Sequence, residues 1–200
     1  MIILLRHGET EWNVARRIQG HQESRLTPLG ERQARAMAGL AADLVAREPA
    51  APAWRLVSSP LGRTRQTAEA VARRTGLPIE FDARVAEIAC GEWEGRLRGE
   101  IAEAHPELFA TREWFFAAPG GETYEDVAAR IGGFLADLPP EAERRVIVVS
   151  HGIAGRVLRG LYAGLPRQAV LDLEVPQDAV FRLMGGQIDR FDCEPLEEEA

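Results

Sequence analysis

Two histidines stand at matching places in the chain, each after a short run of apolar residues. The run 1–5 is followed by Arg6 and His7, the run 145–149 leads to His151, and a glycine follows each histidine. Short unbroken apolar runs are typical of strands that are buried on both faces of a parallel sheet. Ligands of such sheets bind beyond the carboxyl ends of the strands. If the two strands are neighbours, both imidazoles and Arg6 face one pocket; alternatively, each histidine only ends its strand.

A second guanidinium group is expected at this pocket. Ser59 followed by Pro60 resembles a capping residue with proline at the first helical position, which predicts a helix to about residue 74. Arg63 would lie in the first turn, where helical side chains lean toward the N-terminus and so toward the pocket. A helix N-terminus also attracts anions. Arg65, two positions later, is expected to point away as an exposed charge.

Two imidazoles and two guanidinium groups in one pocket suit phosphoryl transfer. A guanidinium fork binds two phosphate oxygens at once, and a neutral imidazole is a competent nucleophile toward phosphorus. The sequence contains no P-loop, no paired-carboxylate metal motif and no cysteine nucleophile motif. Catalysis of phosphoryl transfer is mostly positioning and charge stabilisation. We therefore expect no metal and no other cofactor.

Five short motifs follow one another along the chain. They are Leu5-Arg6-His7-Gly8-Glu9-Thr10, Ser59-x-Leu61-x-Arg63-Thr64, Glu87 before Gly91-x-Trp93-Glu94-Gly95, Pro119-Gly120-Gly121-Glu122, and Ser150-His151-Gly152. In this order and spacing they resemble the histidine phosphatase superfamily, in its phosphoglycerate mutase-like branch. The resemblance extends to about residue 160. It implies a three-layer sandwich fold and a reaction that passes through a phosphohistidine.

The resemblance also implies a role for each matched position. His7 would be the nucleophile, and Arg6, Arg63 and His151 would hold the phosphoryl oxygens. Glu87 would protonate the leaving oxygen and then activate water; from the residues alone it reads better as a loop carboxylate paired with an arginine. The remaining substrate or phosphate contacts would come from Asn13, Gln19, Gly20 and Gly152.

Metal-independent hydrolysis of phosphomonoesters is the favoured activity. The mutases of this family carry a long insertion after the acid, with a lysine and an adjacent arginine pair that hold the substrate carboxylate. Here the span 87–119 is short, it has no lysine, and its arginines are not adjacent: Arg96, Arg98 and Arg112. A mutase dependent on 2,3-bisphosphoglycerate is the alternative. A non-catalytic phosphate-binding protein is disfavoured because none of the motif residues is lost.

The rest of the sequence predicts an α/β fold with a mainly parallel central sheet and helices on both faces. Further strands are expected at 54–58, 79–81, 178–184 and 188–191, the last at a sheet edge. Helices are expected at 11–17, 27–46, 59–74, 96–117 with a break near Pro106, 123–138, 153–163 and 166–173. Thr27 before Pro28, and Thr123 with Asp126, are typical N-terminal helix caps. We expect one domain over 1–193 and an acidic tail over 194–200.

Composition narrows the class of partner. Two hundred residues suit one domain, and a net charge of −7 argues against a nucleic-acid binder. All 24 basic residues are arginine, which excludes lysine-dependent chemistry. Cys90 and Cys193 lack metal-ligand spacing, so a reduced cytoplasmic protein is expected, and no apolar run is long enough to cross a membrane. The expected partner is a small phosphate ester, with the chain as a monomer or homodimer.

Aromatic residues after Glu87 bear on the leaving group. The glycines on either side of Trp93 predict a tight loop with this ring at its tip. An apolar pocket wall would favour a bulky leaving group, but packing in the core is the favoured role for Trp114, Phe115 and Phe116. The candidate wall residues are Trp93, Leu97, Trp114, Phe115 and Phe116. The pattern does not indicate which ester is the physiological substrate.

Overall fold

A six-stranded sheet forms the centre of the computed structural model, which describes residues 1–48, 52–110 and 112–194. The strands are β1 (Ile2–Arg6), β2 (Arg55–Ser58), β3 (Ile79–Phe81), β4 (Val146–Ser150), β5 (Ala179–Met184) and β6 (Gln187–Asp192). Their order is β3-β2-β4-β1-β5-β6; the first four are parallel, β5 pairs antiparallel with β1, and β6 pairs antiparallel with β5. The predicted mainly parallel α/β sheet with its last strand at an edge is therefore confirmed. Most of the expected acidic tail lies outside the described residues.

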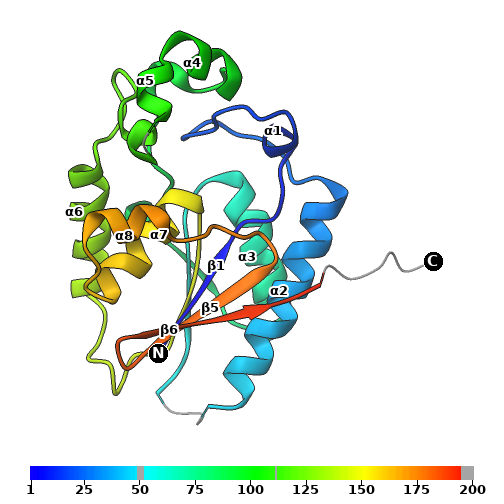
Figure 1. Ribbon diagram of the computed structural model, residues 1–200. Helices are drawn as coiled ribbons and strands as arrows, with labels where there is room; N and C mark the ends of the chain where they lie inside the picture. The colour runs from blue at the N-terminus through cyan, green and yellow to red at the C-terminus, as the bar shows by residue number, and fades with distance from the viewer. Residues whose placement is uncertain (49–51, 111, 195–200) are drawn as a thin grey trace.

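Helices cover both faces of the sheet (Figure 1). The long ones are α2 (Pro28–Ala46), α3 (Gly62–Thr75), α6 (Tyr124–Ala136) and α7 (Gly152–Tyr162). Side chains alternate along a strand, so Ile2 and Leu4 pack with α6 and α7, whereas Ile3 and Leu5 pack with α2 and α3. The central strands are buried on both sides, as their unbroken apolar sequences indicate.

Shorter segments lie at the rim of the sheet. They are α1 (Glu11–Val14), η1 (Ala83–Val85), η2 (Gly91–Trp93), α4 (Arg98–Ala104), α5 (Pro106–Phe109), η3 (Arg112–Phe116) and α8 (Arg167–Asp172). The predicted break at Pro106 is confirmed, because this proline begins α5. Together α4, α5 and η3 form a cap above the carboxyl ends of the parallel strands (Figure 1). Within the described residues, no helix is long and apolar enough to cross a membrane.

The predicted helix caps are right at two places and wrong at a third. Thr27 accepts a hydrogen bond from the Gly30 amide, and Thr123 and Asp126 bond reciprocally. Ser59, however, does not cap α3, which begins only at Gly62 after an N-cap without a side-chain bond. The Ser59 hydroxyl lies 2.8 Å from Nε2 of His151 instead.

The first predicted helix is shorter than expected. It ends at Val14 rather than near residue 17, because Arg16 adopts a left-handed backbone conformation with φ of 54°. The next residue, Arg17, forms an isolated β-bridge with Leu97. Because of this pairing, the chain at Arg17 is extended rather than helical and lies beside the start of α4 in the cap.

Candidate functional site

The ends of β1 and β4 bring the two histidines together. The strands are adjacent and parallel, with Arg6 opposite Ser150, so His7 and His151 leave the sheet side by side. Their ring centroids are 5.3 Å apart and their planes meet at 61°. The two residues are only 2% and 1% exposed. The prediction that the two strands bring both imidazoles together is confirmed, but only His7 lines the large cavity described below; His151 lies beside it, at a small separate pocket.

A hydrogen bond indicates which ring nitrogen of His7 carries a proton. Nδ1 of His7 lies 2.7 Å from the Gly8 carbonyl oxygen. A carbonyl only accepts, so Nδ1 donates and Nε2 keeps its lone pair. Burial, with Arg6 and Arg63 nearby, holds the pKa of His7 well below its usual range, and burial with Arg63 does the same to the pKa of His151. Both rings are therefore neutral near pH 7.

Two guanidinium groups lie beside the histidines; Arg63 is buried and Arg6 is partly buried. Arg6 donates from Nη1 to the Val175 carbonyl, and Arg63 donates to the carbonyls of Gln22 and Gly20 at 2.9 and 2.7 Å. Nε of each has no hydrogen-bond partner among the described residues. Burial lowers the pKa of Arg6 to about 10 and also lowers that of Arg63, which leaves both charged at neutral pH. We refer to Arg6, His7, Arg63 and His151 as the histidine end of the site.

The N-terminus of α3 is itself occupied. Both carboxylate oxygens of Glu23 accept from the Gly62 amide, at 2.8 and 2.9 Å. Anion binding near this helix therefore depends on the side chain of Arg63. Arg65 is exposed as predicted and lies over the Phe81 ring, 4.3 Å from its centroid.

Glu87 is held by backbone amides. Its Oε1 accepts from Ile88 and Ala154 at 3.0 Å each, and its Oε2 accepts from Ile153 at 3.2 Å. Ile153 and Ala154 lie in the first turn of α7, where a carboxylate is favoured by the helix dipole. A Cβ on Gly152 would lie 3.6 Å from Glu87 Oε2. These contacts hold the carboxylate beside the strand ends. Its oxygens accept from backbone amides, whereas the residues alone had favoured pairing with an arginine.

Arg130 of α6 holds the backbone around Glu87. Its Nη1 donates to the carbonyls of Arg84 and Ala86 at 2.7 and 2.8 Å, and its Nη2 donates to that of Glu87 at 3.1 Å. Nε bonds to the Glu122 carboxylate at 2.7 Å. The sequence motifs contained Glu122 but did not indicate that it anchors an arginine behind Glu87.

The other predicted contact residues also line the cavity. Asn13 accepts from Gln177 at 2.9 Å, and Oε1 of Gln19 is buried without a partner among the described residues. Gly20 has φ of 53°, and a Cβ there would lie 2.1 Å from a Glu94 carboxylate oxygen. Only glycine fits this turn, which presents its carbonyl to Arg63.

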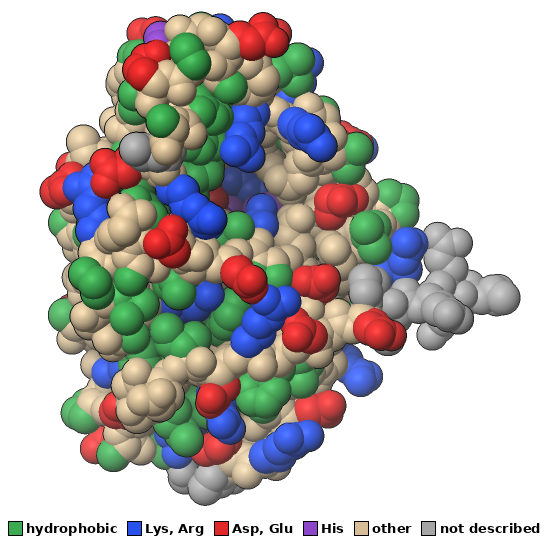
Figure 2. Space-filling view, in the orientation of Figure 1, with side chains coloured by type: hydrophobic (Ala, Val, Ile, Leu, Met, Phe, Trp, Pro, Cys, Tyr) green, Lys and Arg blue, Asp and Glu red, His purple; other side chains and the backbone are tan. Residues whose placement is uncertain are grey.

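A cavity of about 870 Å³ opens between the strand ends and the cap. Figure 2 shows basic side chains gathered in this hollow. Glu87 is the one acidic residue in the lining, against six arginines: Arg6, Arg16, Arg17, Arg63, Arg98 and Arg156. Over the described part of the chain, no group of three or more His, Cys, Asp or Glu residues is arranged to hold a metal ion.

We refer to Arg16, Arg98, Trp114 and Arg156 as the cap end of the cavity. Trp114 and Phe115 line it and stack on each other, with ring centroids 3.8 Å apart. Of the candidate wall residues, Trp114 and Phe115 line the cavity, whereas Leu97 and Phe116 lie outside the lining. The favoured role in core packing also holds, because Trp114 is part of the core and Phe115 and Phe116 pack against it. The prediction of Trp93 at a loop tip is wrong. This ring is 3% exposed because it packs in the core, 6.5 Å from the Trp114 ring.

The arginines of the cap end were not predicted as site residues. Arg156 carried a usable signal, because it follows Gly152 by four positions on one helix and therefore shares its face. Arg16 and Arg98 carried none, because their contact with the cavity depends on the pairing of two distant loops. Val175 and Gln177, which bond to Arg6 and Asn13, were also missed.

Comparisons with known proteins agree with the geometry. The family model of the histidine phosphatase superfamily, branch 1, matches residues 2–193. A probable phosphoglycerate mutase GpmB of Salmonella paratyphi C is 35% identical over 190 residues, which cover 91% of this chain and 83% of the relative.

Two solved structures are also similar. A mycobacterial glucosyl-3-phosphoglycerate phosphatase in complex with VO3 has a TM-score of 0.76 and 32% identity over 90% of both chains. YhfR of Bacillus stearothermophilus has a TM-score of 0.75 and 30% identity over 94% of this chain and 93% of its own. The predicted family is confirmed: the chain belongs to branch 1 of the histidine phosphatase superfamily.

Proposed function

We propose that this chain hydrolyses phosphomonoesters through a phosphohistidine on His7, without a metal. One observation carries the proposal: a neutral imidazole with its Nε2 lone pair available lies beside two guanidinium groups whose Nε atoms are buried and unpartnered among the described residues. Such groups are suited to binding a phosphoryl group and placing a nucleophile against it. The similar glucosyl-3-phosphoglycerate phosphatase supports a hydrolytic activity.

The first step transfers the phosphoryl group to the protein. The Nε2 lone pair of His7 attacks phosphorus, and the ester P–O bond breaks with its electrons moving to the alcohol oxygen. Glu87 gives a proton to that oxygen. Arg6, Arg63 and His151 hold the other phosphoryl oxygens and offset their negative charge. The Gly8 carbonyl stabilises the positive charge that His7 acquires, since Nδ1 donates to it.

The second step returns the nucleophile to its starting state. The Glu87 carboxylate takes a proton from water, and the water oxygen attacks phosphorus. The P–N bond breaks, its electrons return to Nε2 of His7, and inorganic phosphate leaves. Both steps draw their charge stabilisation from guanidinium groups, which is why the proposal includes no metal.

Phosphoglycerate mutation is the second candidate, because the curated relatives include probable phosphoglycerate mutases. It would use the same phosphohistidine but pass the phosphoryl group to a bound monophosphate instead of water. We favour hydrolysis because the span from Glu87 to α6 contains no lysine and no adjacent arginine pair.

Steady-state release of inorganic phosphate tests the proposal. The substrates are p-nitrophenyl phosphate and a panel of sugar, hydroxy-acid and nucleotide monoesters, with and without a chelator. We expect turnover that is insensitive to the chelator and inhibited by vanadate. Interconversion of phosphoglycerates that depends on 2,3-bisphosphoglycerate, without phosphate release, would identify a mutase. Chelator inhibition that added Mg²⁺ or Zn²⁺ reverses would contradict the metal-free mechanism.

A further inference from the structure

The cavity carries more positive charge than one phosphoryl group requires. Six arginines and one carboxylate line it, and both imidazoles of the histidine end are neutral near pH 7. A bound phosphomonoester dianion offsets only two of these positive charges. The excess occurs in a chain whose net charge is −7, so it is a local feature of this cavity.

Arg156 is the clearest sign of a second binding group. Its side chain lines the cavity and the residue is 6% exposed, yet Nε and Nη1 have no hydrogen-bond partner among the described residues. Buried charges in proteins are normally paired. Arg156 lies one helical turn after Gly152, and helical side chains lean toward the N-terminus. Its guanidinium therefore faces the cavity from α7 and is available to an anion.

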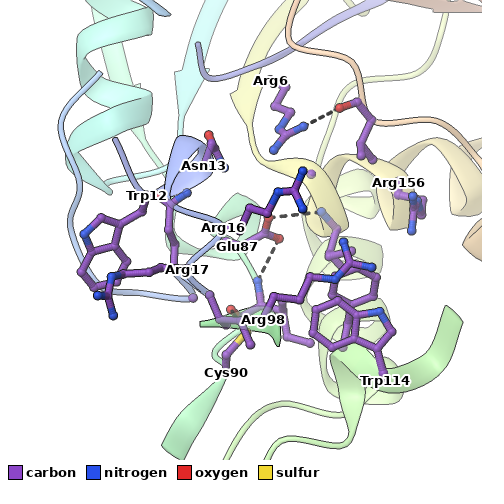
Figure 3. A pocket seen from close by; sticks show the side chains of 18 of the residues that line it. Arg6, Trp12, Asn13, Arg16, Arg17, Glu87, Cys90, Arg98, Trp114 and Arg156 are labelled. Atoms are coloured by element: carbon purple, nitrogen blue, oxygen red, sulfur yellow. Dashed lines mark hydrogen bonds between the residues drawn. The ribbon is translucent and has the colours of Figure 1, made fainter. Parts of the chain in front are cut away.

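Arg98 faces the same space from the cap. It begins α4, and its guanidinium lies 5.0 Å from the Trp114 ring centroid. Figure 3 shows Arg98 along the Trp114 ring, with Arg156 on the same side of the cavity. A guanidinium stacked on an aromatic face keeps its N–H edge free for a carboxylate or phosphate. The two arginines thus approach one region from different elements.

Arg16 is tied to Arg98 through the backbone. Its φ of 54° is uncommon for a residue other than glycine. Its carbonyl accepts from the Arg98 amide at 2.9 Å, and its own amide donates to the Asn13 carbonyl at 3.1 Å. Unfavourable backbone conformations persist where the surroundings enforce them, and they cluster at functional sites. Here the enforced turn keeps a third arginine at the cavity rim.

We propose that Arg156 and Arg98, with Arg16 at the rim, form a second oxyanion subsite that binds a carboxylate or phosphate on the alcohol part of the substrate. The inference rests on the proposed function, in which the phosphoryl group to be transferred occupies the histidine end. Trp114 and Phe115 line the same end and offer an apolar wall to the carbon skeleton. The preferred substrates are therefore phosphate esters of hydroxy acids or bisphosphates, rather than esters of neutral alcohols.

Matched pairs of esters test the subsite through kcat/KM. 3-Phosphoglycerate and glycerol 3-phosphate differ only in a carboxylate, and fructose 1,6-bisphosphate and fructose 6-phosphate differ only in a second phosphate. We expect the more anionic member of at least one pair to be favoured by about 10- to 100-fold, as for charge-assisted hydrogen bonds. A preference in the first pair alone identifies a carboxylate, in the second alone a phosphate, and in both a general oxyanion subsite.

Two variants connect this preference to the residues. Arg156→Met and Arg98→Met should each reduce the preference by about 10-fold, the effect of losing one charge-assisted contact. Arg98 is exposed, so its variant serves if removal of the buried Arg156 prevents folding. Arg35→Met removes the same charge from an exposed position of α2 and should leave the preference unchanged. Equal kcat/KM within both pairs, or a preference that survives both cavity variants, would overturn the inference.

Binding separates this inference from the proposed function. If the wild-type chain turns over no ester, the proposed function fails, but calorimetric Kd values for 3-phosphoglycerate and glycerol 3-phosphate, and for the two fructose phosphates, still test the subsite. We expect tighter binding of the more anionic ester in at least one pair in the wild-type chain and a smaller difference in Arg156→Met. Equal Kd values within both pairs in the wild-type chain would contradict the subsite.

Discussion

The two ends of the cavity are built in different ways. The histidine end comes from the ends of two adjacent strands and the first turn of a helix, and His7, Arg63 and His151 are at most 2% exposed. The cap end combines a loop after α1, two segments of the cap and one side of α7. Arg16 and Arg98 at this end are exposed to solvent.

We expect this difference to separate the proposed reaction, at the histidine end, from the choice among esters, at the cap end. Side chains at the histidine end are fixed by sheet pairing, so the atoms of the proposed reaction are held by the most buried part of the fold. Side chains at the cap end depend on loops, which vary more easily between related proteins and often carry specificity. We therefore expect changes at the histidine end to reduce turnover of every ester, whereas changes at the cap end alter the choice among esters.

The largest expected effect is that of His7→Ala. Removing the nucleophile should reduce kcat by about 10⁴-fold or more for every ester, as with other covalent catalysts. His105→Ala, a change at a half-exposed cap histidine, serves as the control for the substitution itself. Phosphate release by both variants is measured on the same ester panel. Substantial turnover by His7→Ala would show that the nucleophile lies elsewhere.

Two arginines of α3 test the histidine end by matched substitutions. Arg63→Ala should reduce kcat/KM by about 10²- to 10³-fold, because one charge contact to a transferring phosphoryl group is lost. Arg65→Ala removes an exposed arginine two residues later and should have little effect. Steady-state kinetics on p-nitrophenyl phosphate compare the two. Similar losses in both variants would contradict a specific role for Arg63.

Arg130 tests whether the histidine end also needs support from α6. Arg130→Met should lower kcat by about 10- to 100-fold through misplacement of Glu87, since small displacements of catalytic groups are costly. KM should change little, because Arg130 does not line the cavity. Arg130→Lys should restore part of the activity, and thermal unfolding monitors stability. A raised KM with an intact kcat would argue against this positioning role.

The smallest expected effect is the dependence of stability on pH. The pKa values of His7 and His151 are lowered in the folded chain, whereas the usual histidine value is 6.5. The unfolded state therefore binds more protons below this pH, and the free energy of unfolding should fall as pH decreases from 7 to 5.5. Each histidine contributes at most about 1.4 kcal/mol per pH unit. Urea unfolding should show a shallower fall in His151→Asn; equal slopes would contradict neutral burial of His151.

The sequence supported the histidine end better than the cap end for a physical reason. Two apolar runs each lead to a His-Gly pair. If the two strands are neighbours and parallel, this pattern is enough to bring His7 and His151 together. Arg63 followed from the direction of helical side chains, although α3 begins at Gly62 and not at Ser59. The cap end depends on the left-handed turn at Arg16 and its pairing with Arg98, a contact between distant segments. Because all 24 basic residues are arginine, residue type alone did not distinguish these positions.

Trapping of the phosphorylated protein tests the central claim most directly. The wild-type chain is mixed with a ³²P-labelled phosphomonoester, quenched within milliseconds and digested, and the labelled peptide is sequenced. We predict a label that is stable to base and labile to acid, located on His7, absent from His7→Ala and released to water as inorganic phosphate. A label on another residue, or turnover without any labelled protein, would contradict the account.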